Sequence, residues 1–130
     1  MSKFPKQERL NSLKRIAYLV NQGHTLHAYP FRIRWCVGDS SDAAFHLEAA
    51  FSVPKRKHKK ATRRNRIKRK MREAFRLNKE DFKERCGLRT QTLSLLVIYT
   101  PQKDEAYATM EKGMQEAFRL LENKLKTQTQ

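Results

Sequence analysis

Residues 55–72 read KRKHKKATRRNRIKRKMR, and twelve of these eighteen residues are Lys or Arg. None is Asp or Glu, and two apolar residues, Ile67 and Met71, stand inside the run. A run of charge is usually a solvated face, but like charges one helical turn apart destabilise a bare helix. Twelve basic residues without one acid therefore favour the binding of a polyanion.

On a helix, at about 100° per residue, the later part of this stretch becomes two-sided. Ile67, Met71, Ala74 and Phe75 fall on one narrow face, and the basic residues spread over the rest. We expect a helix from about Arg63 whose apolar face packs on a sheet and whose guanidinium groups are held in fixed positions. A membrane-surface helix is a weaker interpretation, because the core needs the same apolar face.

The totals of the chain agree with a polyanion partner. Its 130 residues carry a net charge of +16, a pI of about 10.3 and a mean hydropathy of −0.85. This length fits one domain, 1–130, and we expect residues 1–9 and 127–130 to be disordered. Nucleic acid is the first candidate partner, an anionic membrane surface the second and an acidic protein the third.

The cysteines and the amino-terminal residues indicate a reduced, cytoplasmic protein. Cys36 and Cys86 are expected to be buried or half-buried thiols, and MSKFPKQERLNSLK lacks the apolar stretch of a secretory signal. No apolar run approaches the length of a transmembrane helix.

Hydrophobic periodicity predicts the elements before the basic run. A helix should extend from Asn11 to Gly23. Its buried face is predicted to contain Leu13, Ile16, Ala17 and Val20. Residues 29–37 and 43–53 both alternate between apolar and polar side chains and flank a short polar turn, which predicts an antiparallel hairpin.

The elements after the basic run follow in the same way. The basic helix should end or kink at Asn78, with a further helical piece up to Cys86. Residues 92–100 form an apolar run typical of a buried strand, and a helix should run from Asp104 to about Lys126. The order α-β-β-α-β-α predicts an α+β sandwich.

Catalytic and metal-binding side chains are not indicated. His24, His27, His46 and His58 are scattered and have no companion ligands at metal-site spacing. The acid pairs Glu80-Asp81 and Asp104-Glu105 fit helix starts better than a two-metal site.

The segments FSV (51–53) and ATRRNRIKRKMREAF (61–75) resemble the signature of the protein subunit of bacterial ribonuclease P. The residues that match it are Ser52, Val53, Ala61, Arg64, Asn65, Arg66, Lys68, Arg69, Arg72, Ala74 and Phe75. The resemblance implies the order αβββαβα, a sheet of about four strands and a left-handed βαβ crossover around the basic helix.

The resemblance also implies the function. The enzyme would be a ribonucleoprotein endonuclease whose RNA subunit, with bound Mg²⁺, removes the 5′ leader of precursor tRNA. The protein would bind that catalytic RNA and the precursor tRNA as a monomer in a one-to-one complex. It would have no catalytic side chain, no metal site of its own and no membrane partner.

Two groups of site residues follow from the resemblance. The RNA-binding residues would be Lys55, Arg56, Lys57, Lys59, Lys60, Arg63, Arg64, Asn65, Arg66, Lys68, Arg69 and Arg72. The single-stranded leader would lie in a cleft between the first helix and the sheet, with Tyr18, Phe31, Arg32 and Arg34 as candidates. Aliphatic Ile16 and Val20 replace aromatic residues that the family normally carries, so leader contacts should depend more on charge.

Two other classes of function were weighed. A structural RNA-binding protein of ribosomal type has the same basic composition. DNA binding by residues 64–76 is weaker, because no short-turn helix pair precedes them.

Overall fold

The computed structural model describes residues 13–39, 44–86 and 91–128. The elements along the chain are α1 (Leu13–Gln22), β1 (His24–Ala28), β2 (Phe31–Asp39), β3 (His46–Ser52), α2 (Ala61–Arg85), β4 (Gln91–Tyr99) and α3 (Tyr107–Gln128). The order αβββαβα and the α+β class are therefore confirmed. Residues 127 and 128 belong to α3, so disorder from residue 127 is wrong; residues 1–9, 129 and 130 lie outside the described residues.

The sheet has the strand order β1-β2-β4-β3. β2 pairs antiparallel with both β1 and β4, whereas β3 pairs parallel with β4. The expected hairpin between residues 29–37 and 43–53 is wrong, because β4 lies between these two strands. β4 is the most apolar strand and is buried in the middle of the sheet, and the parallel β3–β4 pair needs the long crossover that α2 supplies.

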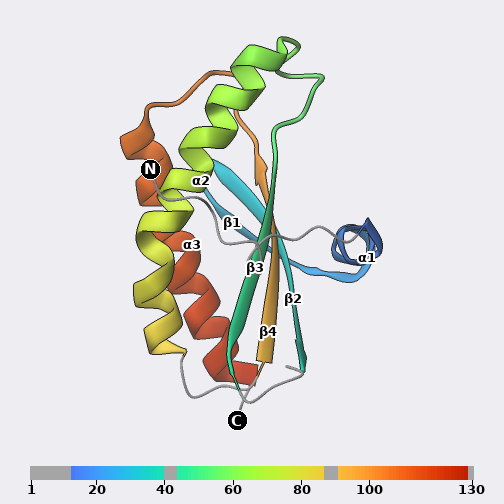
Figure 1. The fold of residues 1–130 in the computed structure, drawn as a ribbon, viewed down its shortest axis with the longest axis vertical. Helices are drawn as coiled ribbons and strands as arrows, with labels where there is room; N and C mark the ends of the chain where they lie inside the picture. Colours follow the sequence, from blue (N-terminus) through green and yellow to red (C-terminus); the bar gives the residue numbers. More distant parts are fainter. Residues whose placement is uncertain (1–12, 40–43, 87–90, 129–130) are drawn as a thin grey trace.

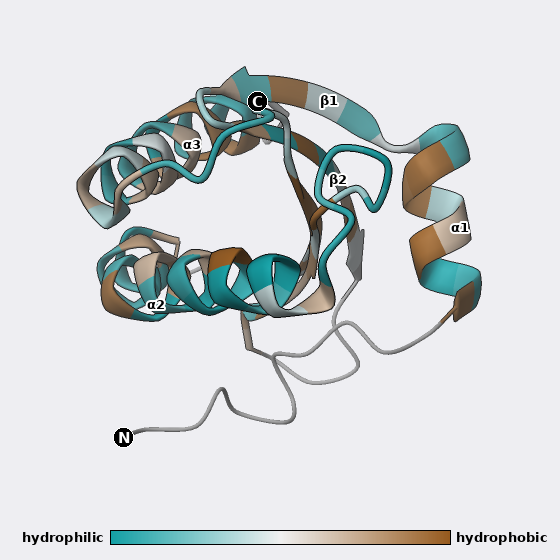
Figure 2. Ribbon diagram, turned by 90° about the horizontal axis from the view of Figure 1, so that it is seen from above, coloured by the Kyte–Doolittle hydropathy of each residue, from teal (hydrophilic) through white to brown (hydrophobic). Residues whose placement is uncertain are grey.

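Two layers of helix enclose the sheet (Figure 1, Figure 2). α2 and α3 pack side by side on one face, and α1 lies alone on the other. The main core lies under α2 and α3. It contains the predicted face of the basic helix, since Ile67, Met71, Ala74 and Phe75 are all fully buried. Apolar residues of α3, from Met110 to Leu125, lie in the same core.

α2 is one continuous helix of 25 residues. It begins at Ala61, two residues earlier than expected. An end at Asn78 is wrong: the Asn78 side-chain amide donates a hydrogen bond to the Ala74 carbonyl at 2.7 Å and stays within the helix. Phe82, fully buried, carries the apolar face on through the last turns.

α1 packs on the sheet by a different face from the one predicted. Leu19 is fully buried and Ile16 half-buried against Leu96 and neighbouring residues of the sheet. Leu13 and Val20 are 82% and 53% exposed, and Ala17 is also exposed. Apolar residues occur on more than one side of this short helix, so periodicity alone does not select the face that packs.

Arg34 of β2 ties the end of α1 to the sheet. Its Nε donates to the Leu19 carbonyl at 2.9 Å, its Nη2 to the Val20 carbonyl at 2.7 Å, and its Nη1 to the hydroxyl of Thr25. A cation at a helix C-terminus satisfies carbonyls that have no partner in the helix. Gly23 follows the helix as expected, and no glycine among the described residues has a positive φ, so Gly23 does not end α1 in the left-handed conformation.

The free thiols lie where burial was expected. Cys86 is buried in the main core and Cys36 is half-buried under α1, on the opposite face of the sheet. No helix within the described residues is long and apolar enough to cross a bilayer.

Replacing Arg34 by Ala should loosen α1. The change leaves two helix-terminal carbonyls without their donor, and we expect a loss of about 1–3 kcal/mol in local stability. Hydrogen exchange of the α1 amides should accelerate, as read by mass spectrometry. Arg32→Ala is the control, because Arg32 is exposed and has no hydrogen-bond partner among the described residues. Equal exchange in both variants would contradict the role of Arg34.

Gly113 of α3 permits a close approach between that helix and the β1–β2 turn. A Cβ at this position would meet the Tyr29 carbonyl oxygen and lie 2.7 Å from Pro30 Cδ. Gly113→Ala should therefore destabilise the protein by about 1–2 kcal/mol in chemical denaturation, because overpacking outweighs the helix-propensity gain of about 1 kcal/mol. Gly38→Ala meets no atom within 4 Å and should cause no loss. A Gly113→Ala protein as stable as wild type would refute the close contact.

Candidate nucleic-acid interface

A compact loop leads from the sheet into α2. After Val53 and Pro54, the backbone N–H groups of Lys57 and His58 both donate to the Pro54 carbonyl, at 3.2 Å each. α2 then begins at Ala61. The basic segment, which we define as residues 55–72, thus consists of this loop and the first three turns of α2.

The basic segment gathers the predicted RNA-binding residues at one end of the molecule, where Figure 2 shows hydrophilic residues along the loop and the start of α2. Their exposure differs. The exposed members are Lys55, Arg56, Lys59, Lys60, Asn65, Arg66, Arg69 and Arg72, and the half-buried members are Lys57, Arg63, Arg64 and Lys68. Ile67 and Met71 alone among the segment's apolar residues are buried, and they fix α2 to the core.

Most hydrogen bonds made by this segment go to neutral carbonyls. Arg64 Nη1 donates to the carbonyls of His58 and Lys59 at 2.8 and 2.9 Å, and Arg63 Nη2 donates to the Gln102 carbonyl at 2.9 Å. A carbonyl orients a guanidinium group without neutralising it. These residues are therefore held in place with their charge still uncompensated.

Only one carboxylate in the described residues pairs with the basic segment. Asp104 accepts from Arg66 Nε at 2.8 Å and from Lys70 Nζ at 2.7 Å. Besides Arg63 and Arg64, the basic side chains of the segment without a carboxylate partner in the described residues are Lys55, Arg56, Lys57, Lys59, Lys60, Lys68, Arg69 and Arg72. The acids among the described residues therefore leave most of the charge of the basic segment available for a polyanion.

The Asp104 carboxylate is stabilised as the anion. Burial opposes its charge, but hydrogen bonds from Lys70 and Arg66 outweigh burial and lower the pKa of Asp104 below its ordinary value. A lowered pKa in the folded state gives stability that is present above the unfolded value and is lost as the pH falls through the folded value. The pairing is therefore intact at neutral pH.

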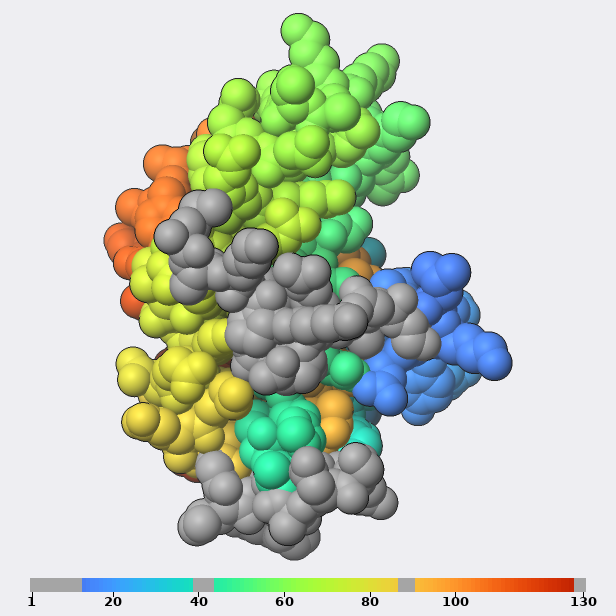
Figure 3. Space-filling model, viewed as in Figure 1, coloured from blue at the N-terminus to red at the C-terminus, as the bar shows by residue number. Residues whose placement is uncertain are grey.

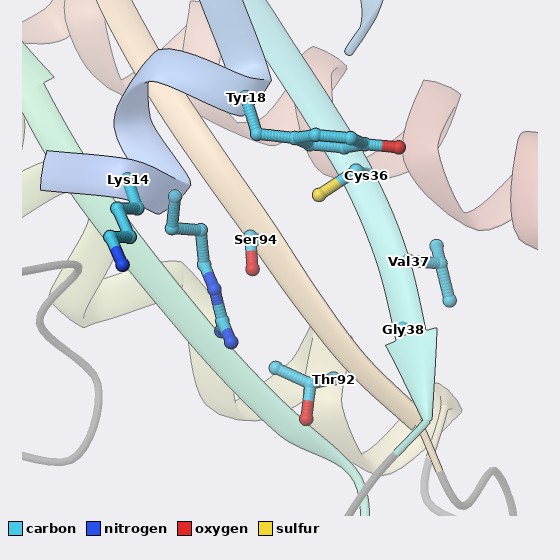
Figure 4. A pocket seen from close by; sticks show the side chains of 8 residues that line it. Lys14, Tyr18, Cys36, Val37, Gly38, Thr92 and Ser94 are labelled. Carbon is cyan, nitrogen blue, oxygen red and sulfur yellow. The ribbon is translucent and has the colours of Figure 1, made fainter. Parts of the chain in front are cut away.

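A second feature is a cavity of about 500 Å³ between α1 and the sheet. Its lining residues are Lys14, Arg15, Tyr18, Cys36, Val37, Gly38, Thr92 and Ser94. Figure 4 shows the Tyr18 ring beside Cys36, and burial raises the pKa of the Cys36 thiol. Glu48 supports this cavity, because it accepts hydrogen bonds from Arg15 and, at 2.6 Å, from Ser94.

The cavity lies on the α1 face of the sheet, and the cavity and the basic segment lie toward opposite ends of the strands. The cavity adjoins Gly38 and Thr92, which pair at one end, whereas the basic segment follows β3 at the end where Ser52 pairs with Ile98. α1 stands over the middle of this face (Figure 1), and the surface recedes between α1 and the segment that leads into α2 (Figure 3).

The four leader-cleft candidates occupy different places. Tyr18 is exposed and lines the cavity. Arg32 is exposed on the same sheet face and is paired with Ile98 of β4, near the basic segment. Arg34 uses its guanidinium group to hold α1. Phe31 is 2% exposed in the main core, so it belongs to the opposite face and not to the cleft.

Lys14, Arg15, Thr92 and Ser94 line the cavity but were missed from the sequence. A signal was present: Thr92 and Ser94 are polar at alternate positions of an otherwise apolar strand, which marks the face away from the main core.

Two of the four histidines, His58 and His24, contact other residues of the fold. His58 is 1% exposed, with Nε2 2.8 Å from the Pro101 carbonyl oxygen, and His24 packs on Trp35 with ring centroids 4.7 Å apart. The described residues contain no group of three or more His, Cys, Asp or Glu side chains placed to hold a metal ion.

Comparison with known proteins assigns the family. The family model described as Ribonuclease P matches residues 4–122. The Ribonuclease P protein component of Porphyromonas gingivalis is 32% identical over 114 residues, which cover 86% of this chain and 81% of that protein.

Solved structures agree on the fold. The RNase P protein of Staphylococcus aureus superposes with a TM-score of 0.65 at 20% identity, covering 89% of this chain and 96% of that one. The RNase P protein from Thermotoga maritima gives a TM-score of 0.64 at 20% identity, covering 87% of this chain and 96% of that one. The sequence match over most of the chain and this shared architecture lead to one conclusion: the chain belongs to the ribonuclease P protein family.

Proposed function

We propose that this protein is the protein component of ribonuclease P, an endoribonuclease that removes the 5′ leader of precursor tRNA. One observation carries the proposal. Guanidinium and ammonium groups of the basic segment are fixed by a core-anchored helix and by backbone carbonyls, yet most of them have no carboxylate partner in the described residues. An ordered array of uncompensated cations suits the phosphates of a folded RNA.

The basic segment supplies the contact with the catalytic RNA. Arg side chains can bind phosphate with two parallel hydrogen bonds, and the Lys residues of the loop neutralise the backbone less specifically. If about six phosphates are contacted, the logarithm of the binding constant should fall with the logarithm of salt concentration at a slope of about −4 to −5.

The sheet face beside α1 is the proposed path of the single-stranded leader. Tyr18 offers an exposed ring on which a base can stack, and Arg32, near the basic segment, offers a cation that has no carboxylate partner among the described residues. Lys14 adds a second exposed cation at the cavity. The leader would then run between the cavity and the end of the sheet where the catalytic RNA is bound.

The chemistry is assigned to the RNA subunit with Mg²⁺, and no protein side chain is proposed as catalytic. The protein acts by binding and by charge neutralisation. We expect it to act in the cytoplasm as a monomer in a one-to-one complex with the RNA.

Reconstitution with ribonuclease P RNA tests the function. Adding the protein should accelerate cleavage of precursor tRNA at low Mg²⁺ concentration. The acceleration should shrink as the Mg²⁺ concentration rises, because the basic side chains of the protein and Mg²⁺ neutralise the same phosphates. Cleavage is followed on a gel by release of the leader. Absence of stimulation would rule the proposal out, and recovery of ribosomal RNA instead of ribonuclease P RNA in a pull-down would favour a ribosomal-type protein.

Replacing Arg64, Asn65 and Arg66 together by Ala should weaken binding of the catalytic RNA. The slope of the logarithm of the binding constant against the logarithm of salt concentration should become shallower by about 2, one for each of the two lost arginine–phosphate contacts. The matched control is Lys112→Ala with Lys124→Ala, which removes the same charge from exposed positions on α3. The control should bind as wild type does. Circular dichroism must show both variants folded, and equal losses in the two would contradict a specific role for the basic segment.

A further inference from the structure

The connection between β4 and α3, residues 100–106, lies against the basic segment. The Thr100 carbonyl accepts from Lys57 Nζ at 2.6 Å, Pro101 from His58, and Gln102 from Arg63. Each successive carbonyl of this connection therefore meets a side chain further along the basic segment. The connection thereby fixes the course of the loop and of the first turn of α2.

Asp104 continues this series on the next turn of α2. Its Oδ2 accepts from Arg66 and its Oδ1 from Lys70, and Lys70 Nζ also donates to the Glu105 carbonyl at 3.0 Å. Arg66 and Lys70 are four residues apart, so they lie one above the other on the helix. One carboxylate thus fixes two neighbouring cations.

The backbone around Asp104 is itself held by the core. Tyr99 is fully buried, its hydroxyl donates to the Lys103 carbonyl at 2.6 Å, and the same hydroxyl accepts from the Glu105 N–H at 2.8 Å. Asp104 lies between these two anchored residues. Its carboxylate is therefore a fixed point of attachment and not the end of a mobile loop.

Arg66 keeps its phosphate-binding edge while it is held. Asp104 contacts only Nε, and the two terminal nitrogens of Arg66 have no hydrogen-bond partner among the described residues. The Arg66 side chain is 56% exposed, whereas that of Asp104 is 19% exposed. The carboxylate therefore orients the guanidinium group through Nε and leaves the two terminal nitrogens available to a phosphate.

We propose that Asp104 is a positioning residue for RNA binding, which orders Arg66 and Lys70 before the RNA arrives. The inference rests on the proposed function of the basic segment. Immobilising a long side chain on binding costs conformational entropy, and prior ordering removes that cost. Against this gain stands the repulsion between a carboxylate and the phosphates of RNA.

The two effects predict opposite signs for one substitution. Asp104→Asn makes the protein more positive by one charge, so simple attraction to a polyanion predicts tighter binding. Positioning predicts weaker binding, because Arg66 and Lys70 lose the charged group that orders them. The direction of the change therefore separates the two accounts.

The test compares Asp104→Asn with Glu116→Gln in the full chain. Glu116 is the matched control: it is an acid of α3 that pairs with Arg119 alone among the described residues, and its loss changes the net charge equally. Affinity for ribonuclease P RNA is measured at fixed salt, under conditions where unfolding curves show each variant to be fully folded. We expect about fivefold weaker binding for Asp104→Asn and unchanged or tighter binding for Glu116→Gln.

A double-mutant cycle separates positioning from a general structural role. In a chain that already carries Arg66→Ala and Lys70→Ala, adding Asp104→Asn should cause no further loss of affinity. A loss that persists there, or an Asp104→Asn chain that binds as tightly as Glu116→Gln, would overturn the inference alone. A wild-type chain that does not bind the RNA would overturn the proposed function as well.

Discussion

The structure depends on the burial of one side of α2 against the sheet. Ile67, Met71 and Phe75 are fully buried there, and each such side chain contributes about 1.5–3 kcal/mol. Repulsion between like charges one turn apart costs only about 0.2–0.5 kcal/mol per pair. Burial therefore outweighs repulsion, and a helix that would be unstable alone is held rigid with its cations outward.

The distribution of acids explains why this charge stays available. Nine of the thirteen Asp and Glu residues lie in the second half of α2, in α3 and in the connection before α3: Glu73, Glu80, Asp81, Glu84, Asp104, Glu105, Glu111, Glu116 and Glu122. Many of them pair with bases of those helices, as Glu122 does with Arg85. Asp104 alone among the described acids reaches into the basic segment, where it orients as well as neutralises. The basic segment thus carries a strong positive charge, whereas positive and negative charges nearly cancel over the second half of α2, the connection before α3 and α3 itself.

Two predictions from local sequence patterns were wrong because long-range packing decided the outcome. Residues 29–37 and 43–53 look like a hairpin because a polar turn joins two alternating runs, but β4 is more apolar and displaces β3 from β2. The packing face of α1 was wrong because Leu19, not the longer stripe through Leu13 and Val20, meets the sheet. In both places the choice depends on a surface contributed by residues far along the chain.

The sequence by itself determined the basic helix and its buried face at Ile67, Met71, Ala74 and Phe75, because these follow from local periodicity. Its charge predicts a polyanion as the partner. It also carried the family, through the Arg64-Asn65-Arg66 signature. Only the tertiary structure decided that β3 lies parallel to β4 and that the guanidinium group of Arg34 binds the end of α1. It also decided that Asp104 pairs with Arg66, although the two residues are 38 positions apart in the sequence. Those outcomes arise from contacts between distant segments, whose geometry no local pattern encodes.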